Sequence, residues 1–219
     1  MAPPERPIDS LLDAGYKRLL VRPNLEKLEH IYRRPLFDLI AESHRFHLEF
    51  WPKNEVQLCT LLSVKTGGCS EDCGYCSQSA RYNTGLERQQ LMTKDEVLPV
   101  AQRARENGST RFCMGAAWKG VRDGEQKFDQ MLDTIRSVSE LGMEVCVTLG
   151  QLGDTEARKL KDAGVTAYNH NIDTSPEHYA KIVSTHTFQD RLNTILSLIH
   201  ISEPTRQAEI SYAVFCLKK

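Results

Sequence analysis

The sequence predicts an α/β fold made of repeated parallel βα units. Short apolar segments alternate with amphipathic helical segments, the alternation recurs about every 30 residues, and a glycine follows three of the predicted helices. Four such units make half of an eightfold barrel or most of a small open sheet. No Gly-x-Gly-x-x-Gly follows the first predicted strand and no phosphate-loop motif occurs, so a dinucleotide-binding fold has no support.

A segment of different character precedes these units. Residues 1–24 are rich in Pro, Arg and Asp, show little sustained periodicity, and are predicted to form a loosely ordered lead-in. From Leu25 to Phe50 the apolar residues recur at near-helical spacing, which predicts an N-terminal helical extension. Pro35 must interrupt or restart this helix, because its ring clashes with the preceding turn.

The βα units then follow in order along the chain. Apolar runs with strand-like composition predict strands at 56–66, 109–115, 144–149 and 165–173. Periodic segments predict helices at 94–107, 125–141, 154–163, 176–182 and 188–198. Thr93 is placed to cap the first of these five helices, and the glycines that follow three of them are Gly108, Gly142 and Gly164.

Composition excludes several classes of protein. The 28 Lys and Arg residues nearly balance 29 Asp and Glu residues, which argues against a nucleic-acid partner. No apolar stretch approaches the roughly 18–20 residues that span a bilayer, so no membrane partner is expected. The N-terminus carries Glu5, Asp9 and Asp13 and no apolar core, which argues against a secretory signal and weakens a transit peptide. We therefore expect a cytoplasmic protein, or a mitochondrial one if the source is eukaryotic.

Cysteine usage is the first unusual feature. The chain has seven cysteines, an odd number that does not suggest a disulfide framework in a chain without a signal peptide. Cys69, Cys73 and Cys76 fall within eight residues, just past the carboxyl end of the first predicted strand, which is the catalytic face of parallel α/β folds. Nearby glycines at 67, 68 and 74 give the backbone freedom to wrap an inorganic cluster.

The number of thiols in this motif separates two kinds of metal site. Structural zinc normally takes four ligands, so a structural zinc or cluster site would need Cys59 as its fourth. A 4Fe–4S cluster held by three cysteines leaves one iron open for a small-molecule ligand. The spacing favours the second alternative, because Cys59 falls within the predicted strand and not in the loop.

Alternation along the next two strands brings further cysteines together. Arg111 and Cys113 share one strand face, and Glu144, Cys146 and Thr148 share one face of the following strand. Adjacent strands lie about 4.8 Å apart, so Cys113 and Cys146 could ligate one second cluster. Two small buried cysteines are the alternative.

The fourth predicted strand also carries polar side chains on one face. Asn169, Asn171 and Asp173 share this face, opposite His170 and its neighbours. Three polar side chains at the carboxyl end of a strand make a binding site a better interpretation than a core.

The motif C-x-x-x-C-x-aromatic-C after the first strand resembles that of the radical S-adenosylmethionine superfamily. The resemblance implies a partial or complete βα barrel, here a partial (β/α)8 TIM-type barrel holding about the first four βα units. It implies that Cys69, Cys73 and Cys76 ligate a 4Fe–4S cluster whose open iron binds S-adenosylmethionine, with Tyr75 near the adenine. An electron delivered through the cluster would cleave the sulfonium and yield a radical that abstracts hydrogen from substrate.

Four sequence blocks resemble the biotin synthase family more narrowly. They are LLSVKTGGCSEDCGYCSQSARY, STRFCMGAAWK, VTLG and YNHNIDTSPE, and the similarity runs from about Leu25 to about Leu198. The family implies sulfur insertion that converts dethiobiotin to biotin, with an auxiliary 2Fe–2S cluster as the sulfur source. It also implies an electron donor such as flavodoxin or ferredoxin, and a homodimer for the full-length protein.

The same resemblance assigns roles to individual residues. Cys113 and Cys146 become catalytic residues as ligands of the auxiliary cluster, and Arg111 supports that cluster. Asn171 and Asp173 match positions that contact S-adenosylmethionine, while Asn169 and Asn171 would approach dethiobiotin. His170 is expected to be structural. The open alternatives are another biotin-synthase-like radical enzyme and a non-catalytic metal-binding module.

The sequence departs from the family towards its C-terminus. The family's auxiliary cluster takes a third cysteine from the fifth strand and an arginine from a later strand, and neither position has a counterpart here. Residues 199–219 resemble a translated sequencing adapter, so we expect a non-native tail and do not assign Cys216 as a ligand. We therefore expect residues 25–198 to form a truncated barrel domain, and the chain as written to be inactive.

Overall fold

The computed structural model describes residues 24–50, 56–198 and 201 of the chain. The chain divides into two compact units, Met1–Val56 and Gln57–Lys219. Apart from Asn24 and Ile201, the predicted lead-in and the predicted tail lie outside the described residues. Within the described part, no helix combines the length and apolar character needed to cross a bilayer.

The first unit contains the predicted helical extension. Helix α1 spans Leu25–Tyr32 and helix α2 spans Leu36–Phe50, with Pro35 between them. Asn24 caps α1, because its side-chain oxygen accepts a hydrogen bond from the backbone N–H of Lys27 at 2.8 Å. The predicted interruption at Pro35 is confirmed.

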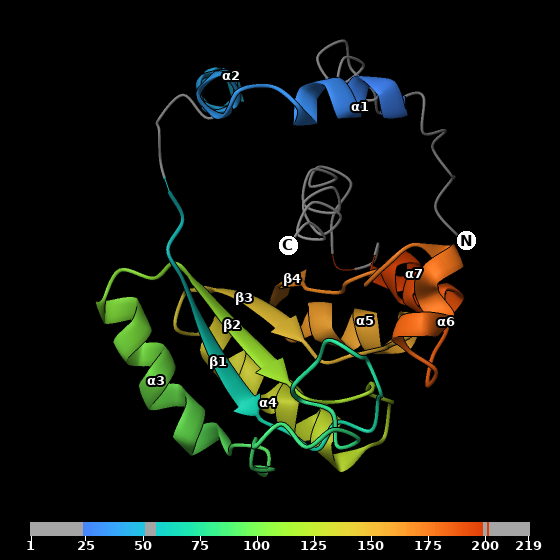
Figure 1. Ribbon diagram of the computed structural model, residues 1–219. Helices are drawn as coiled ribbons and strands as arrows, with labels where there is room; N and C mark the ends of the chain where they lie inside the picture. The colour runs from blue at the N-terminus through green and yellow to red at the C-terminus, as the bar shows by residue number, and fades with distance from the viewer. Residues whose placement is uncertain (1–23, 51–55, 199–200, 202–219) are drawn as a thin grey trace, which may run out of the picture. The chain divides into compact units, whose positions relative to one another are not determined.

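The second unit is built on a four-stranded parallel sheet with the order β1-β2-β3-β4 (Figure 1). The strands are β1 (Cys59–Lys65), β2 (Arg111–Ala116), β3 (Glu144–Thr148) and β4 (Val165–Tyr168). Each strand therefore pairs with the next one in the chain, which is the arrangement that successive βα units produce. The predicted parallel α/β fold is confirmed.

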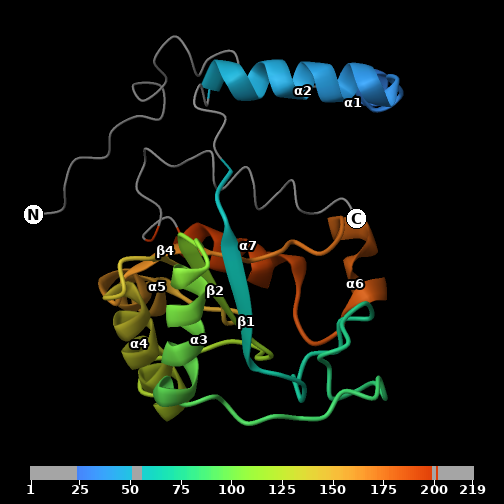
Figure 2. The ribbon, with the colours of Figure 1, turned by 90° about the vertical axis from the view of Figure 1, so that its left-hand side faces the viewer.

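Three helices cover one face of this sheet (Figure 2). They are α3 (Lys94–Glu106), α4 (Gln126–Ser139) and α5 (Asp154–Asp162). After β4 the chain continues into a 3-10 turn (Pro176–His178), α6 (Tyr179–Ile182) and α7 (Phe188–Ser197). The core lies between the sheet and its three helices, where Phe112, Val145 and Phe128 are fully buried.

The helix ends follow the predicted signals. The backbone N–H and the hydroxyl of Thr93 both donate to the Glu96 carboxylate, at 2.7 and 2.9 Å, which forms the N-terminal cap of α3. Gly108, Gly142 and Gly164 have φ values of 89°, 79° and 105°, the left-handed conformation that ends a helix and favours glycine.

The other face of the sheet is not covered by these helices. Burial alternates along β2 and β3, so that on β2 Phe112 and Met114 are buried while Arg111 and Cys113 are only half-buried. On β1 the side chain of Leu61 is 74% exposed. This second face carries the cysteines and charged residues that the sequence places on the strands.

The fourth strand is less than half as long as predicted. The fourth strand ends at Tyr168 and not at Asp173. The backbone N–H of Asn169 still donates to the carbonyl of Val147 at 2.9 Å, after which the chain leaves the sheet and Asp173 adopts a φ of 70°. The assignment of Asn169, Asn171 and Asp173 to one strand face is therefore wrong, because strand alternation ends where the ladder ends.

Candidate active site

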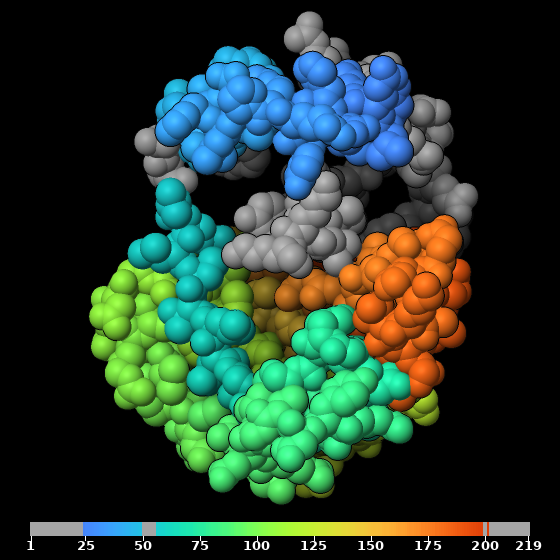
Figure 3. Space-filling view, in the orientation of Figure 1, coloured from blue at the N-terminus to red at the C-terminus, as the bar shows by residue number. Residues whose placement is uncertain are grey.

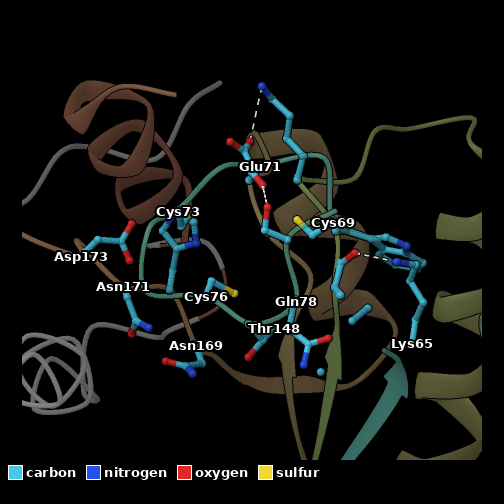
Figure 4. Close-up of a pocket in the computed structure, with 18 of the residues that line it drawn as sticks. Lys65, Cys69, Glu71, Cys73, Cys76, Gln78, Thr148, Asn169, Asn171 and Asp173 are labelled. Carbon is cyan, nitrogen blue, oxygen red and sulfur yellow. Dashed lines mark hydrogen bonds and ion pairs between the residues drawn. The ribbon is translucent and has the colours of Figure 1, made fainter. Parts of the chain in front are cut away.

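The cysteine motif forms a loop directly after β1. Gly67 and Gly68, at φ values of 68° and 67°, turn the chain out of the strand. The N–H of Cys69 donates to the carbonyl of Gln78 at 2.9 Å, and the N–H of Cys76 donates to the carbonyl of Cys73 at 3.0 Å. These bonds fold residues 69–78 into a compact loop that brings the three cysteines to one pocket (Figure 4).

The three thiols are free and largely shielded from water. Cys69 and Cys73 are buried and Cys76 is half-buried. Burial raises the pKa of the Cys69 thiol, and it raises the pKa of the Cys73 thiol to about 11. A bound metal cation reverses this effect, since a coordinating thiol loses its proton. The loop is therefore suited to thiolates that are stabilised by a metal.

The donor set fits a cluster better than a single ion. Within residues 24–50, 56–198 and 201, no three His, Cys, Asp or Glu side chains are placed to hold one metal ion. In a four-iron cluster each cysteine binds a different iron atom, so the thiols line a pocket and need not point at one centre. Three free thiols around one pocket fit that group.

Cys59 lies too far away to complete a four-cysteine site. It is the first residue of β1, whereas the cysteine motif follows the last residue of the strand, Lys65. A strand rises about 3.3 Å per residue, so these two ends are about 20 Å apart. Cys59 is also exposed. The structural zinc site with Cys59 as the fourth ligand is therefore excluded.

The pocket lies at the carboxyl ends of the strands. Its volume is about 380 Å³, within the range of small-molecule sites. Ser63 and Lys65 of β1, Gly115 of β2 and Thr148 of β3 contribute to its wall. Asn169, Asn171 and Asp173 line the same pocket from the loop after β4 (Figure 4). The predicted polar set thus meets the cysteine loop, although it does so from a loop and not from a strand.

Asp173 is held by protein partners. Its side chain is only 2% exposed, and its carboxylate accepts hydrogen bonds from Arg191 at 3.0 Å and from the Tyr179 hydroxyl at 3.2 Å. The Tyr75 hydroxyl donates to the other carboxylate oxygen. Burial alone would raise the pKa of Asp173, but the hydrogen bonds from Tyr75 and Tyr179 and the charge of Arg191 lower it. Asp173 therefore stays ionised and fixes Tyr75.

His170 is buried beside Arg191 at the edge of the same pocket. It is 4% exposed, and its Nε2 lies 3.5 Å from the Arg191 guanidinium. Burial, with the Arg191 charge, lowers the pKa of His170 to about 3, so the ring is neutral. The ring also borders the pocket, which alternation along a strand did not predict.

The second pair of cysteines lies on the uncovered face of the sheet. Cys113 of β2 and Cys146 of β3 are direct partners in the strand register. A hydrogen bond from Cys146 and the charge of Arg111 lower the pKa of Cys113 to about 7 against the opposing effect of burial, while the pKa of Cys146 is raised. Arg111 and Glu144 are also direct register partners, two residues before the cysteine pair on the same strands. Arg111 donates two hydrogen bonds to Glu144, at 2.8 and 2.6 Å.

Sequence reasoning missed four residues of the site. Lys119 follows β2, His186 precedes α7, Arg191 lies on α7, and Glu71 lies between two cysteines. Only Glu71 could have been suspected from the sequence, because it is a charged residue between two cysteines of the loop. The other three reach the site through contacts between distant segments.

These features define a class of protein. A family profile described as "Radical SAM superfamily" matches residues 63–201, which include the cysteine loop and all four strand ends. The chain belongs to the radical SAM superfamily. Membership implies a 4Fe–4S cluster and S-adenosylmethionine, for which the loop and pocket provide the matching donors.

Within this superfamily the chain is similar to biotin synthases. It is 52% identical over 172 residues to biotin synthase from Myxococcus xanthus, covering 78% of this chain and 49% of that protein. It is 54% identical over 181 residues to biotin synthase from Schizosaccharomyces pombe, covering 82% of this chain and 50% of that protein. The chain spans about half the length of the curated relatives it matches.

Solved structures show the same fold at low sequence identity. Methylornithine synthase (PylB) superposes with a TM-score of 0.63 at 18% identity, covering 88% of this chain and 53% of that chain. The FeFe-hydrogenase maturase HydG from Carboxydothermus hydrogenoformans superposes with a TM-score of 0.57 at 21% identity, covering 74% of this chain and 37% of that chain. The predicted partial barrel is confirmed.

Proposed function

We propose that this chain forms the cluster-binding and cofactor-binding part of a biotin synthase, an enzyme that inserts sulfur into dethiobiotin. The observation that carries the proposal is the convergence of Cys69, Cys73 and Cys76 on one pocket that Asn169 and Asn171 also line. The similarity to biotin synthases over about four-fifths of the chain supports this choice within the superfamily.

The chain's own residues have distinct tasks in this proposal. Cys69, Cys73 and Cys76 hold the 4Fe–4S cluster. When bound, the cluster supplies one electron for reductive cleavage of the sulfonium of S-adenosylmethionine. Asn171, with Asp173 and Tyr75 behind it, orients that cofactor, and the walls of the pocket keep water away from a reactive carbon radical.

The auxiliary 2Fe–2S cluster belongs to the proposal as well. Cys113 and Cys146 are opposite each other on the uncovered sheet face, and Arg111 is held beside them by Glu144. Neither cysteine lines the pocket. Each lies two residues before a residue that does, which is Gly115 for Cys113 and Thr148 for Cys146. We assign the pair as ligands of the sulfur-donating cluster, beside the substrate.

The partners follow from the same reaction. Asn169 and Asn171 are assigned to dethiobiotin, since amide groups suit the polar ring of that substrate. A flavodoxin or ferredoxin would deliver the electron, and a homodimer is the proposed state of the full-length protein. We place the protein in the cytoplasm, or in the mitochondrion of a eukaryote.

Anaerobic reconstitution of the chain with ferrous iron and sulfide tests the proposal. We expect about four iron atoms per chain from the triplet, and a change in the electron paramagnetic resonance spectrum of the reduced protein when S-adenosylmethionine is added. Cys73→Ala should abolish both. Cys59→Ala is the matched control, because it removes an exposed cysteine from the opposite end of β1 and should leave both intact.

Two results would contradict the proposal. One is a chain that takes up zinc but no iron and sulfide under these conditions. The other is a cluster whose spectrum S-adenosylmethionine does not change, which would leave a metal-binding module without cofactor chemistry.

A further inference from the structure

Two adjacent acidic residues inside the cysteine loop are bonded to a segment that lies far along the chain. Glu71 and Asp72 separate Cys69 from Cys73, and both carboxylates contact residues 184–186, which connect α6 to α7. The two segments are 112 to 115 residues apart in sequence. In Figure 3 the green cysteine-loop region abuts the orange region that contains α6 and α7.

Asp72 caps the backbone of this connector. Its carboxylate accepts hydrogen bonds from the backbone N–H of Ser184 at 2.9 Å and of Thr185 at 3.1 Å. The Ser184 hydroxyl also donates to it, and the Thr185 hydroxyl oxygen lies 2.9 Å from it. In return, the Thr185 hydroxyl accepts a hydrogen bond from the backbone N–H of Asp72 at 3.1 Å. These bonds lower the pKa of Asp72, so the carboxylate remains ionised.

Glu71 reaches the same connector from the buried side. It is 5% exposed, its carboxylate lies 2.7 Å from His186 Nδ1, and it accepts a hydrogen bond from Thr185. Lys119 lies 3.4 Å from its other oxygen and donates to the Thr185 carbonyl at 2.8 Å. Burial alone would raise the pKa of Glu71, but the hydrogen bonds from Thr185 and His186 outweigh it and the pKa is lowered.

His186 links the connector to Arg191 and, through Arg191, to Asp173 in the pocket wall. Arg191 Nε lies 3.0 Å from His186 Nε2, which makes this nitrogen the acceptor and Nδ1 the donor to Glu71. The same Arg191 Nε lies 3.0 Å from the Asp173 carboxylate, which in turn holds Tyr75. The connector and α7 therefore hold the cysteine loop at Glu71–Asp72 and again at Tyr75.

The thiol of Cys73 lies between these two attachment points. Cys73 packs in a small apolar cluster with Tyr179 and Val183, just before the connector. The backbone N–H of Gly74 also donates to the carbonyl of Ile182 at 2.8 Å. Release of the acidic residues would free the loop on the N-terminal side of this thiol, because a short loop keeps its shape only through such contacts.

We infer that Glu71 and Asp72 are positioning residues that dock the cysteine loop on Ser184–His186, so that the three thiols keep their spacing before any cluster binds. The inference rests on the proposed function, which gives the spacing its purpose. It extends the cluster site to the α6–α7 connector, which contributes no ligand. Thr185 is the central residue, since one hydroxyl contacts both carboxylates.

A matched pair of substitutions at Thr185 tests this inference in the complete chain. Thr185→Val keeps the shape of the side chain and removes the hydroxyl, whereas Thr185→Ser keeps the hydroxyl. In metal-free protein we measure the rate of iodoacetamide labelling at Cys73 by peptide mass spectrometry, with the half-buried Cys146 on the sheet as an internal reference. We expect Thr185→Val to raise labelling at Cys73 about tenfold and Thr185→Ser to restore the wild-type rate.

Substitutions at Asp72 test the contribution of its carboxylate. Asp72→Ala removes the carboxylate that accepts from Ser184 and from the backbone N–H of Thr185, and it should raise Cys73 labelling further. Asp72→Asn keeps one acceptor oxygen and should fall between. Asp123→Ala is the control, because it breaks an exposed ion pair with Lys159 elsewhere in the same unit. It should leave the Cys73 rate unchanged.

Specific results would overturn the inference. Unchanged Cys73 labelling in Thr185→Val and Asp72→Ala would show that the connector does not position the loop. An equal rise at Cys73 and Cys146 would show a general loss of the fold and would overturn a local role. These rates need no metal, so the inference is judged even if the wild-type chain takes up no iron, a result that would contradict the proposed function alone.

Discussion

The two groups of cysteines differ in their immediate surroundings. Cys73 lies among apolar side chains, and burial raises its pKa to about 11. Cys113 receives a hydrogen bond from Cys146 and lies near Arg111, and its pKa is lowered to about 7. Metal-free protein should therefore keep Cys69 and Cys73 as protonated thiols, because burial raises the pKa of both, while Cys113 is partly a thiolate at neutral pH.

The backbone conformation of Gly68 also constrains the cysteine loop. Gly68 has a φ of 67°, and a Cβ built there would lie 2.7 Å from the Arg88 side chain. We expect Gly68→Ala to lower the free energy of unfolding by about 1–3 kcal/mol and to reduce iron uptake. Gly85→Ala is the control, since Gly85 has a similar φ of 72° with no atom within 4 Å. Equal effects of both substitutions in urea titrations would contradict a special role of the Gly68 turn.

His170 gives the molecule a defined dependence on pH. Its pKa is about 3 in the folded chain, against about 6.5 when exposed, so between these values the unfolded state binds a proton that the folded state does not. The free energy of unfolding should therefore fall as pH is lowered from about 6.5, by at most about 1.4 kcal/mol per pH unit from this group. His170→Gln should flatten this part of the curve in urea titrations. Parallel curves for both proteins would contradict a neutral buried His170.

Local signals in the sequence were sufficient to predict where single helices begin and end. Thr93 and Gly108 delimit α3, and Pro35 separates α1 from α2, because caps and breakers act within a few residues. The end of β4 was not predictable in this way. The run from Val165 to Asp173 keeps a strand-like composition, but pairing with β3 stops after Asn169, and only the sheet itself determines that point.

The register between β2 and β3 determines which thiols are neighbours, and this can be tested by cross-linking. Cys113 and Cys146 are direct partners, whereas Cys59 is opposite Arg111, one position along the face. Dibromobimane, which fluoresces when it bridges two neighbouring thiols, should therefore link Cys113 to Cys146 in metal-free protein. Cys113→Ser or Cys146→Ser should each remove this product, as peptide mapping would show. A dominant Cys59–Cys113 product would contradict the register.

The whole molecule combines a predictable scaffold with a site that depends on distant contacts. Hydrophobic periodicity predicted the parallel sheet and its covering helices, and the cysteine spacing predicted the loop at the carboxyl end of β1. The bonds from Glu71 to His186 and from Arg191 to Asp173 join segments that share no local pattern. They arise only when the sheet brings the loops after β1 and β4 to one edge.

In the proposed site, three cysteines hold a four-iron cluster with one iron left for S-adenosylmethionine. Mössbauer spectroscopy of the chain reconstituted with iron-57 tests it most directly, because each iron site is observed separately. We predict a 4Fe–4S spectrum in which S-adenosylmethionine shifts the signal of one iron in four and leaves the other three unchanged. A spectrum in which all four irons remain equivalent after the cofactor is added would contradict the account.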